Sequence, residues 1–355
     1  MQSELRIRLN DDGYKNWIKA GLCLQKTRNC LIGFVISEME KFHQFLLHAN
    51  SLLWRKICRN SCRPQGTEFQ GACDLCEEWK TEILKHHTNQ NNVLYWGNCF
   101  PPLWPKQAWE VAKVYMPRGQ ANTLGPEKCD VAALLNLIIS CDWFDFIERQ
   151  KVIEVMKETG IRQWIDSVEE LTRTCLTNNI LLIIKCRNVL MHSVEMRVST
   201  EWLDNYVQKT VVLLQAFQHI SEAKTAIRII QEIASSDWQV QLTETDAVDA
   251  VNFTDEIDAG EISNAELELL REWMQELHFT VEEQEGLDAQ HLNRLNTFKE
   301  FLKQNKELKN VLHEEVEQLY DVERRWKNGV QTVKDQDSVK WNLEENEGIK
   351  TSSRC

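Results

Sequence analysis

Apolar residues recur at intervals of three and four along most of the chain, the spacing that turns one face of an α-helix toward a core. The pattern predicts a short helix at residues 3–9 and a long one from Tyr14 to about His48, with Asp11 or Asp12 as its N-cap. Further helices are predicted at about residues 75–87, 107–115, 129–147, 148–158, 161–176, 178–193, 199–219 and 221–234. We therefore expect an all-α fold in which residues 1–240 form one helical domain.

The predicted helix 178–193 contains the most apolar run of the chain, Leu181-Leu182-Ile183-Ile184. β-branched residues would also suit a strand there, but the helical spacing continues to His192 and favours a helix. Because the first half is apolar on every side, we expect a central, buried helix.

The pattern changes after residue 240. Residues 241–264 are polar and acidic without a period, which is typical of a linker. From Leu267 the three-and-four spacing returns and continues loosely to Trp326, so residues 265–326 are predicted to form an amphipathic helical hairpin or a short coiled coil. Such a helical pair is a candidate surface for a protein partner. Residues 327–355 are expected to be a disordered tail.

Charge and cysteine content limit the class of protein. The net charge is −13, but residues 244–285 alone hold fourteen acids and one Arg, so the rest of the chain is balanced. This acidic strip suits a basic partner or simply solubility. No signal peptide and no run of 18 apolar residues is visible, so we expect no membrane span and a cytoplasmic protein, with the nucleus as the alternative. In a reducing compartment the twelve cysteines are expected to bind metal or to be buried as thiols.

Residues 54–105 form a Cys-rich insertion with five Cys, four Trp and four of the six Pro. Two close cysteine pairs can complete a tetrahedral Zn²⁺ shell, and four thiolates leave no open position for catalysis. The spacing therefore predicts a structural zinc site, with reduced, buried thiols as the alternative. The predicted ligands are Cys58, Cys62, Cys73 and Cys76, with Cys99 as a substitute for Cys58 or Cys62. His86 and His87 are excluded, because His87 lies about 16 Å from Cys76 along a continuous helix.

Arg187-Asn188-x3-His192 is the second candidate site. Asn188 and His192 are one helical turn apart on the same face, and the long Arg187 side chain can reach toward them. A guanidinium beside an imidazole could clamp a phosphate and move a proton, as RNA cleavage without a metal requires. The alternative is structural: an Arg near a helix C-terminus is favoured by the helix dipole, and His192 would be a satisfied boundary residue.

The segment Ile184-Lys185-Cys186-Arg187-Asn188-x3-His192 resembles the signature helix of HEPN domains, in particular the class found in the DAZ-interacting zinc-finger ubiquitin ligase. The long helix 14–48, the segment Cys129-Asp130-x3-Leu134-Leu135 and the helix beginning near Trp202 resemble other family elements in the same order. The resemblance covers about residues 10–235 and implies a HEPN-like helical bundle.

In active HEPN proteins the equivalents of Arg187, Asn188 and His192 form a metal-independent ribonuclease site, usually across a dimer interface. Many other HEPN domains are inactive and serve as binding or assembly modules. The resemblance therefore implies a homodimer, with RNA as one candidate partner. We expect an interaction or assembly protein; the alternative is a metal-independent endoribonuclease that uses these three residues at a dimer cleft. No basic strip with interleaved aromatic residues is evident in the sequence to support an extended RNA surface.

Overall fold

The computed structural model describes residues 2–55, 58, 62–69, 73–88, 94–120, 125–144, 165–236, 238, 259–283, 289–321 and 323–324. Within these ranges the chain forms helices and two isolated β-bridges, and no strand. The predicted all-α class is confirmed. No helix among the described residues is long and apolar enough to cross a membrane.

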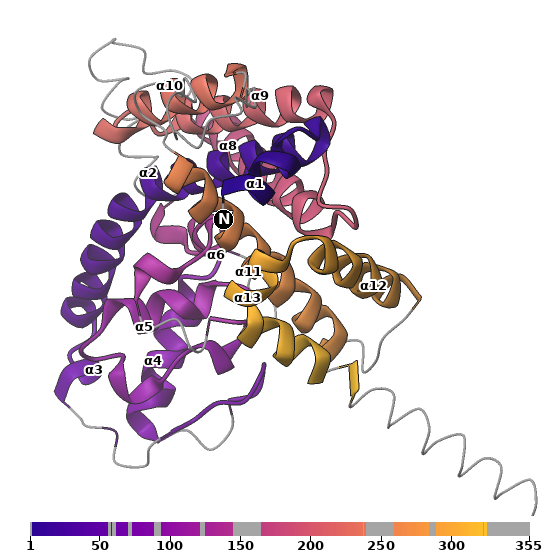
Figure 1. Ribbon diagram of the computed structural model, residues 1–355. Coiled ribbons are helices and arrows are strands. Elements are labelled where there is room, and N and C mark those ends of the chain that lie inside the picture. Colours follow the sequence, from indigo (N-terminus) through magenta and orange to yellow (C-terminus); the bar gives the residue numbers. More distant parts are fainter. Residues whose placement is uncertain are drawn as a thin grey trace, which may run out of the picture.

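Short helices of the Cys-rich region lie at one end of the molecule, and the longer helices α8, α9 and α10 of residues 165–235 lie at the other (Figure 1). The α-helices are α1 (Gln2–Leu9), α2 (Asp12–Ala49), α3 (Leu52–Arg55), α4 (Asp74–Lys85), α5 (Ala108–Ala112), α6 (Val131–Ser140), α8 (Ile165–His192), α9 (Thr200–Ala216), α10 (Ser221–Ser235), α11 (Ala259–Glu283), α12 (Ala289–Gln304) and α13 (Lys306–Val311). Four 3₁₀ turns are η1 (Trp96–Asn98), η2 (Pro101–Leu103), η3 (Lys113–Tyr115) and η4 (Pro126–Lys128). Residues 313–321 are also helical.

The long helix α2 is the central helix of the fold and contacts most of the other helices. Its first turn is capped by Asp11, whose Oδ1 accepts a hydrogen bond from the Tyr14 backbone N–H at 2.8 Å. The apolar residues of α2 pack against α5, α6, α9, α10 and α11, so one helix contributes to nearly every part of the core. The indole of Trp17 donates to the Leu190 carbonyl at 3.0 Å and ties α2 to α8.

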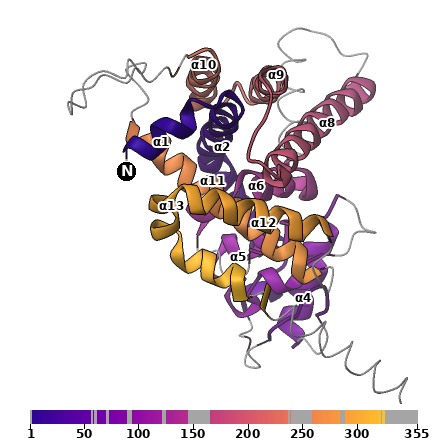
Figure 2. The same ribbon diagram turned by 45° about the vertical axis from the view of Figure 1, so that its right-hand side comes forward.

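Helix α8 differs from the prediction in two ways. The sequence suggested separate helices at 161–176 and 178–193, but the chain forms one continuous helix from Ile165 to His192. The expectation of burial on every side is also wrong, because Leu181, Leu182 and Val189 are exposed. In Figure 2 α8 reaches outward with α9 along one flank.

The predicted helix 129–147 begins later, at Val131, and breaks at Cys141, whose backbone forms a β-bridge with His87. The predicted helix 148–158 lies outside the described residues.

The C-terminal helices do not form a separate hairpin. Helices α11 to α13 pack onto the N-terminal helices and share their hydrophobic core, which corrects the predicted boundary between two units (Figures 1 and 2). Helix α11 begins at Ala259, so the last six residues of the predicted 241–264 linker are helical. A Cβ on Gly21 of α2 would lie 2.7 Å from a methyl group of Leu269, so this glycine lets α11 approach closely. The remainder of the linker and the predicted tail lie outside the described residues.

The Cys-rich region packs against the end of α2 through aromatic rings. Trp79 of α4 and Trp104 are fully buried, with ring centroids 6.3 Å apart, and Phe69 lies 5.8 Å from Trp104. The Trp79 indole donates to the Leu53 carbonyl at 3.1 Å and holds α3 against α4. This aromatic packing fixes the position of α4, the helix on which Cys76 lies.

Candidate functional site

The residues of the Arg-Asn-x3-His motif differ in burial. Arg187 is only 7% exposed, whereas Asn188 and His192 are exposed. At about 100° per residue, Arg187 lies on the flank that packs against the core, about 140° from His192. The motif therefore does not form one open cluster in the monomer.

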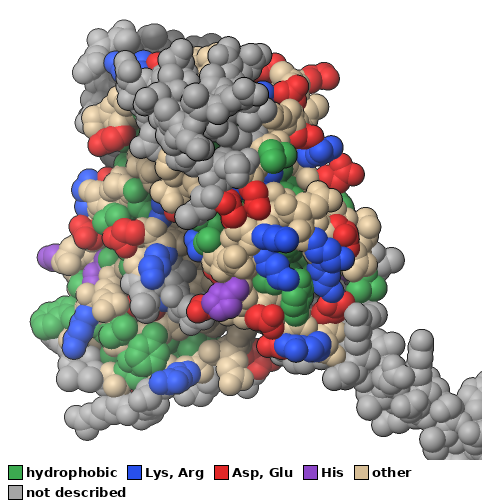
Figure 3. All heavy atoms as spheres, in the orientation of Figure 1, with side chains coloured by type: hydrophobic (Ala, Val, Ile, Leu, Met, Phe, Trp, Pro, Cys, Tyr) green, Lys and Arg blue, Asp and Glu red, His purple; other side chains and the backbone are tan. Residues whose placement is uncertain are grey.

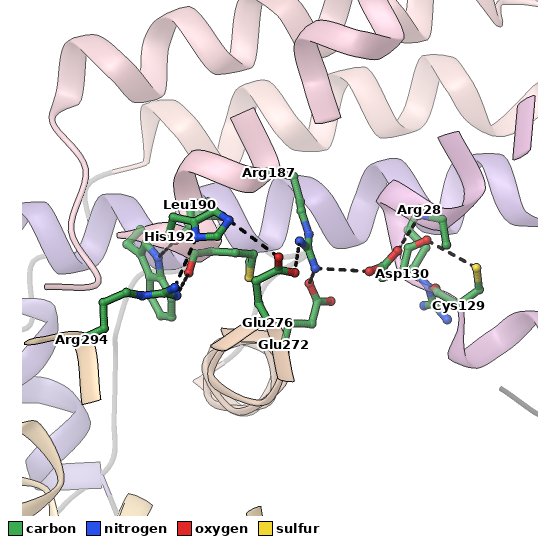
Figure 4. Close-up of polar contacts among 12 residues, drawn as sticks. Arg28, Cys129, Asp130, Arg187, Leu190, His192, Glu272, Glu276 and Arg294 are labelled. Carbon is green, nitrogen blue, oxygen red and sulfur yellow. Dashed lines mark hydrogen bonds and ion pairs between the residues drawn. The ribbon is translucent and has the colours of Figure 1, made fainter. Parts of the chain in front are cut away.

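The guanidinium of Arg187 is surrounded by carboxylates of its own chain (Figure 4). One amino group donates to Glu276 at 2.7 Å; the other donates to Asp130 at 3.3 Å and lies 3.9 Å from Glu272. Asp130 also caps α6, since its Oδ1 accepts from the Ala133 N–H at 2.6 Å. Arg187 thus joins α8 to the start of α6 and to the middle of α11.

His192 is held between Glu276 and Arg294 (Figure 4). A guanidinium nitrogen of Arg294 lies 3.3 Å from the His192 Nδ1, and the other donates to the Met191 carbonyl at 2.7 Å. Because arginine can only donate, Nδ1 must be the acceptor and the ring proton must be on Nε2. Nε2 lies 3.7 Å from Glu276. The lone pair that a general base would need is already used inside the protein.

The local charges favour a neutral imidazole and an ionised guanidinium. Burial and the nearby Arg294 lower the pKa of His192. Burial alone would lower the pKa of Arg187, but the carboxylates of Asp130, Glu272 and Glu276 outweigh it and raise the pKa. Although a third of the Glu272 side chain reaches solvent, burial by the surrounding protein and the charge of Asp130 raise its pKa to about 7. A phosphate would therefore meet repelling carboxylates at Arg187.

The four predicted cysteine ligands come together. The thiol sulfurs of Cys58, Cys62, Cys73 and Cys76 all lie within 4.8 Å of one another, close enough to share a metal ion. The sulfurs of Cys58 and Cys62 are 3.7 Å apart, and the Cys73 backbone N–H donates to the Cys62 sulfur at 3.3 Å. Cys76 lies in the first turn of α4. The packing of this helix through its buried Trp79 fixes the position of the Cys76 side chain. This donor set fits tetrahedral Zn²⁺ better than hard cations, which prefer oxygen.

Cys99 is not part of this cluster, so its predicted role as a substitute ligand is wrong. Its thiol is buried and donates to the Trp96 carbonyl at 3.1 Å. His86 also points elsewhere, since its Nδ1 lies 2.8 Å from Asp142. The other cysteines whose side chains are described are buried, as expected for thiols of the core: Cys23, Cys30, Cys129, Cys141 and Cys186.

Comparison with known sequences places the chain in a family. The profile described as "Domain of unknown function (DUF4559)" matches residues 8–165 and 171–340. The chain belongs to the DUF4559 family. It is also 41% identical over 322 residues to the mouse (Mus musculus) "Uncharacterized protein CXorf38 homolog", an alignment covering 89% of this chain and 92% of that protein. No solved structure matches the chain. The DUF4559 match includes the Cys cluster, α8 and the C-terminal helices, in keeping with their common core.

Sequence reasoning missed the residues that surround Arg187 and His192 in this DUF4559 chain. Asp130 was noticed only within a segment that resembles the HEPN pattern. Glu272 and Glu276 were hidden in the acidic strip, where carboxylates suggested solubility. Their spacing of four on a helix was the one available signal of a shared face. Arg294 had no signal, because nothing local distinguishes it from a surface arginine.

Proposed function

We propose that this DUF4559 protein is a non-catalytic assembly protein built on a HEPN-type helical domain, with a zinc ion that holds its Cys-rich region. The observation that carries the proposal is the closed arrangement around Arg187. Its guanidinium bonds to Glu276 and Asp130 of the same chain, and the His192 lone pair is used by Arg294. A ribonuclease would need both groups free to meet a phosphodiester.

The exposed stripe of α8 is the surface that we assign to assembly. Leu181, Leu182 and Val189 share this side with the polar Asn188 and His192, while the opposite side packs in the core. Exposed apolar residues gathered on one side of a helix mark an interaction surface more often than scattered ones do. We propose a homodimer through this stripe. Many of the described apolar residues of 265–326 pack within the chain, and a protein partner at these helices stays a prediction.

Zinc has a structural role in the proposal. Bound at Cys58, Cys62, Cys73 and Cys76, it would join the loop before α4 to the first turn of α4. Four thiolates leave no site for water, so the ion would supply folding free energy and no chemistry. Reduced thiols also fit a cytosolic location, with the nucleus as the alternative.

The assembly proposal is tested by light scattering coupled to size-exclusion chromatography. Val189→Glu places a charge in the middle of the stripe and is expected to convert dimers to monomers. Val311→Glu on α13 is the matched control, because Val311 is 43% and Val189 is 51% exposed. The control should remain dimeric. A monomeric wild-type protein, or equal effects of the two variants, would contradict the stripe as the interface.

Catalysis is tested in the same preparations by incubation with RNA in the presence of a metal chelator. The proposal expects no cleavage by the wild-type protein beyond that of His192→Ala. Cleavage by the wild type that disappears in His192→Ala would overturn the non-catalytic assignment and favour the endoribonuclease alternative.

A further inference from the structure

A second exposed surface lies at the opposite end of the molecule from the α8 stripe, around α3. Phe45 of α2 is 43% exposed, and Leu52 and Trp54 of α3 are 40% and 55% exposed. Figure 3 shows hydrophobic and basic side chains close together in the lower left, where Figure 1 places α3 and α4. We call Lys41, Phe45, Leu52, Trp54 and Lys85 the α3 surface.

The elements that carry the α3 surface pack against one another, since α3 contacts both α2 and α4. Lys85 Nζ and Asn50 Nδ2 donate to the same oxygen of Glu82, at 2.8 and 3.1 Å, so the end of α4 lies beside the turn that begins α3. The Phe45 ring lies 5.3 Å from the Trp143 ring and 5.8 Å from the His86 ring. Lys41 is one helical turn before Phe45 on the same face of α2. The Phe45 ring is therefore held in place by the neighbouring rings of Trp143 and His86.

At two ion pairs of this surface the lysine is the outer partner. Lys41 is paired with Glu38 at 2.7 Å, but the lysine side chain is 61% exposed and the glutamate 10%. Lys85 and Glu82 are arranged in the same way, at 59% and 13%. In both pairs the ammonium reaches solvent and the carboxylate is largely covered.

We infer that the α3 surface binds single-stranded nucleic acid. Bases stack on exposed aromatic faces whatever their sequence, and lysines beside them attract the phosphates. The position is separate from Arg187 and His192, so the inference goes beyond assembly and does not depend on the α8 stripe. An anionic membrane is a less suitable partner for this surface. A flat bilayer would lie against a broad side of this acidic protein and would be repelled by its carboxylates, whereas a single nucleic-acid strand contacts only a narrow strip.

The test is fluorescence anisotropy of the full-length, zinc-loaded protein with labelled oligouridylate of about 12 nucleotides, within the usual site size. Trp54→Ala is expected to raise Kd about fivefold or more, the loss of one stacked base. Val212→Ala, another exposed hydrophobic on α9 at 47%, should leave Kd unchanged. The same titration with oligothymidylate distinguishes RNA from DNA as the source of the strand.

A charge variant tests the lysine separately. Lys85→Glu is expected to weaken binding and to lower the slope of log Kd against log salt by about 1. Its matched control is Lys303→Glu, because Lys303 also ends a helix, is 67% exposed and pairs with a glutamate three residues earlier. Circular dichroism of each variant checks that the fold is retained.

Three outcomes would overturn the inference. One is an absence of binding to either oligonucleotide at low salt. Another is binding that Trp54→Ala and Lys85→Glu leave unchanged, which would place the nucleic acid elsewhere. The third is co-sedimentation with phosphatidylserine vesicles that Trp54→Ala abolishes, without oligonucleotide binding, which would assign the surface to membranes. Each outcome is independent of the oligomeric state that tests the assembly proposal.

Discussion

Among single residues, Glu276 is the one whose side chain contacts both Arg187 and His192. Its carboxylate accepts from Arg187 at 2.7 Å and lies 3.7 Å from the His192 Nε2. Asp130 similarly combines an N-cap with an arginine contact. A buried guanidinium without these partners would be costly, so the carboxylates and Arg187 are best understood as one structural unit.

The identity of the motif residues could be read from the sequence, but their environment could not. Spacing placed Asn188 and His192 on one face, and both are exposed there. The partners of Arg187 and His192 are 57, 89 and 102 positions away along the chain. Helical periodicity gives the face of each helix, but it does not say which helices meet.

Glu272 should make stability depend on pH near neutrality. Its folded-state pKa of about 7 lies above the ordinary value of 4.5, so the native state holds the proton more firmly than the unfolded chain. The associated stability is present below the ordinary pKa and is lost as pH rises toward 7. Glu272→Gln is therefore expected to raise Tm by a few degrees at pH 8 and to have little effect at pH 4.5, measured by differential scanning fluorimetry.

Glu300→Gln is the control for this pH dependence, because the Glu300 carboxylate is on the surface of α12 and 64% exposed. Its Tm difference from wild type should be small at both pH values. A Glu272→Gln protein that is less stable than wild type at pH 8 would show that the ionised carboxylate supports Arg187 instead of opposing its neighbours.

At the scale of helices, the boundaries could be predicted best where an N-cap residue or an uninterrupted helical spacing of apolar residues indicates them. Helix α9 begins at the N-cap Ser199, within the predicted range 199–219, and α2 spans nearly the predicted range. The prediction divided α8 between residues 176 and 178, but the helix continues there, and Asn178 faces solvent, where an asparagine costs a helix little. The apolar run beyond it suggested burial, but composition cannot distinguish a core face from an exposed apolar one.

The Cys-rich region was recognised from spacing alone, since close pairs restrict the geometry more than any helix pattern does. We expect about one zinc per chain by atomic absorption, in line with four thiolate ligands. Chelation should shift the tryptophan emission to longer wavelength, because the ion would fix the first turn of α4, the helix that carries buried Trp79. Cys76→Ser is expected to lose the zinc and to lower Tm, as removal of a structural metal does.

Cys99→Ser is the control that separates the two ligand sets considered from the sequence. Its thiol donates to the Trp96 carbonyl, and a serine hydroxyl can do the same. The zinc content should therefore remain at the wild-type value. Loss of zinc in Cys99→Ser, or retention of zinc in Cys76→Ser, would contradict Cys58, Cys62, Cys73 and Cys76 as the four ligands.

At the scale of the whole molecule, a buried polar network joins the N-terminal helices α1 and α2 to α11 and to the start of α13. Arg8 of α1 donates to both carboxylate oxygens of Glu266 on α11, at 2.7 and 2.8 Å, and to Asn305 at 2.8 Å. The Tyr14 hydroxyl donates to the same carboxylate at 2.7 Å. The acidic strip is therefore not only a solubilising segment, because several of its carboxylates lie inside the fold. The sequence could not reveal this, since the pairs are 252 to 297 residues apart.

This network predicts that the chain unfolds as one unit. The side chains of Arg8 and Glu266 are 7% and 1% exposed, so Glu266→Ala would leave a buried, uncompensated arginine. Such a loss costs about 3–5 kcal/mol. Denaturation followed by circular dichroism and by tryptophan fluorescence should give coincident curves in both proteins, with the variant shifted to lower denaturant. Glu300→Ala breaks an exposed pair and should change stability by less than about 1 kcal/mol. Two separate transitions, of which Glu266→Ala affects only one, would restore the independent C-terminal hairpin expected from the hydrophobic pattern.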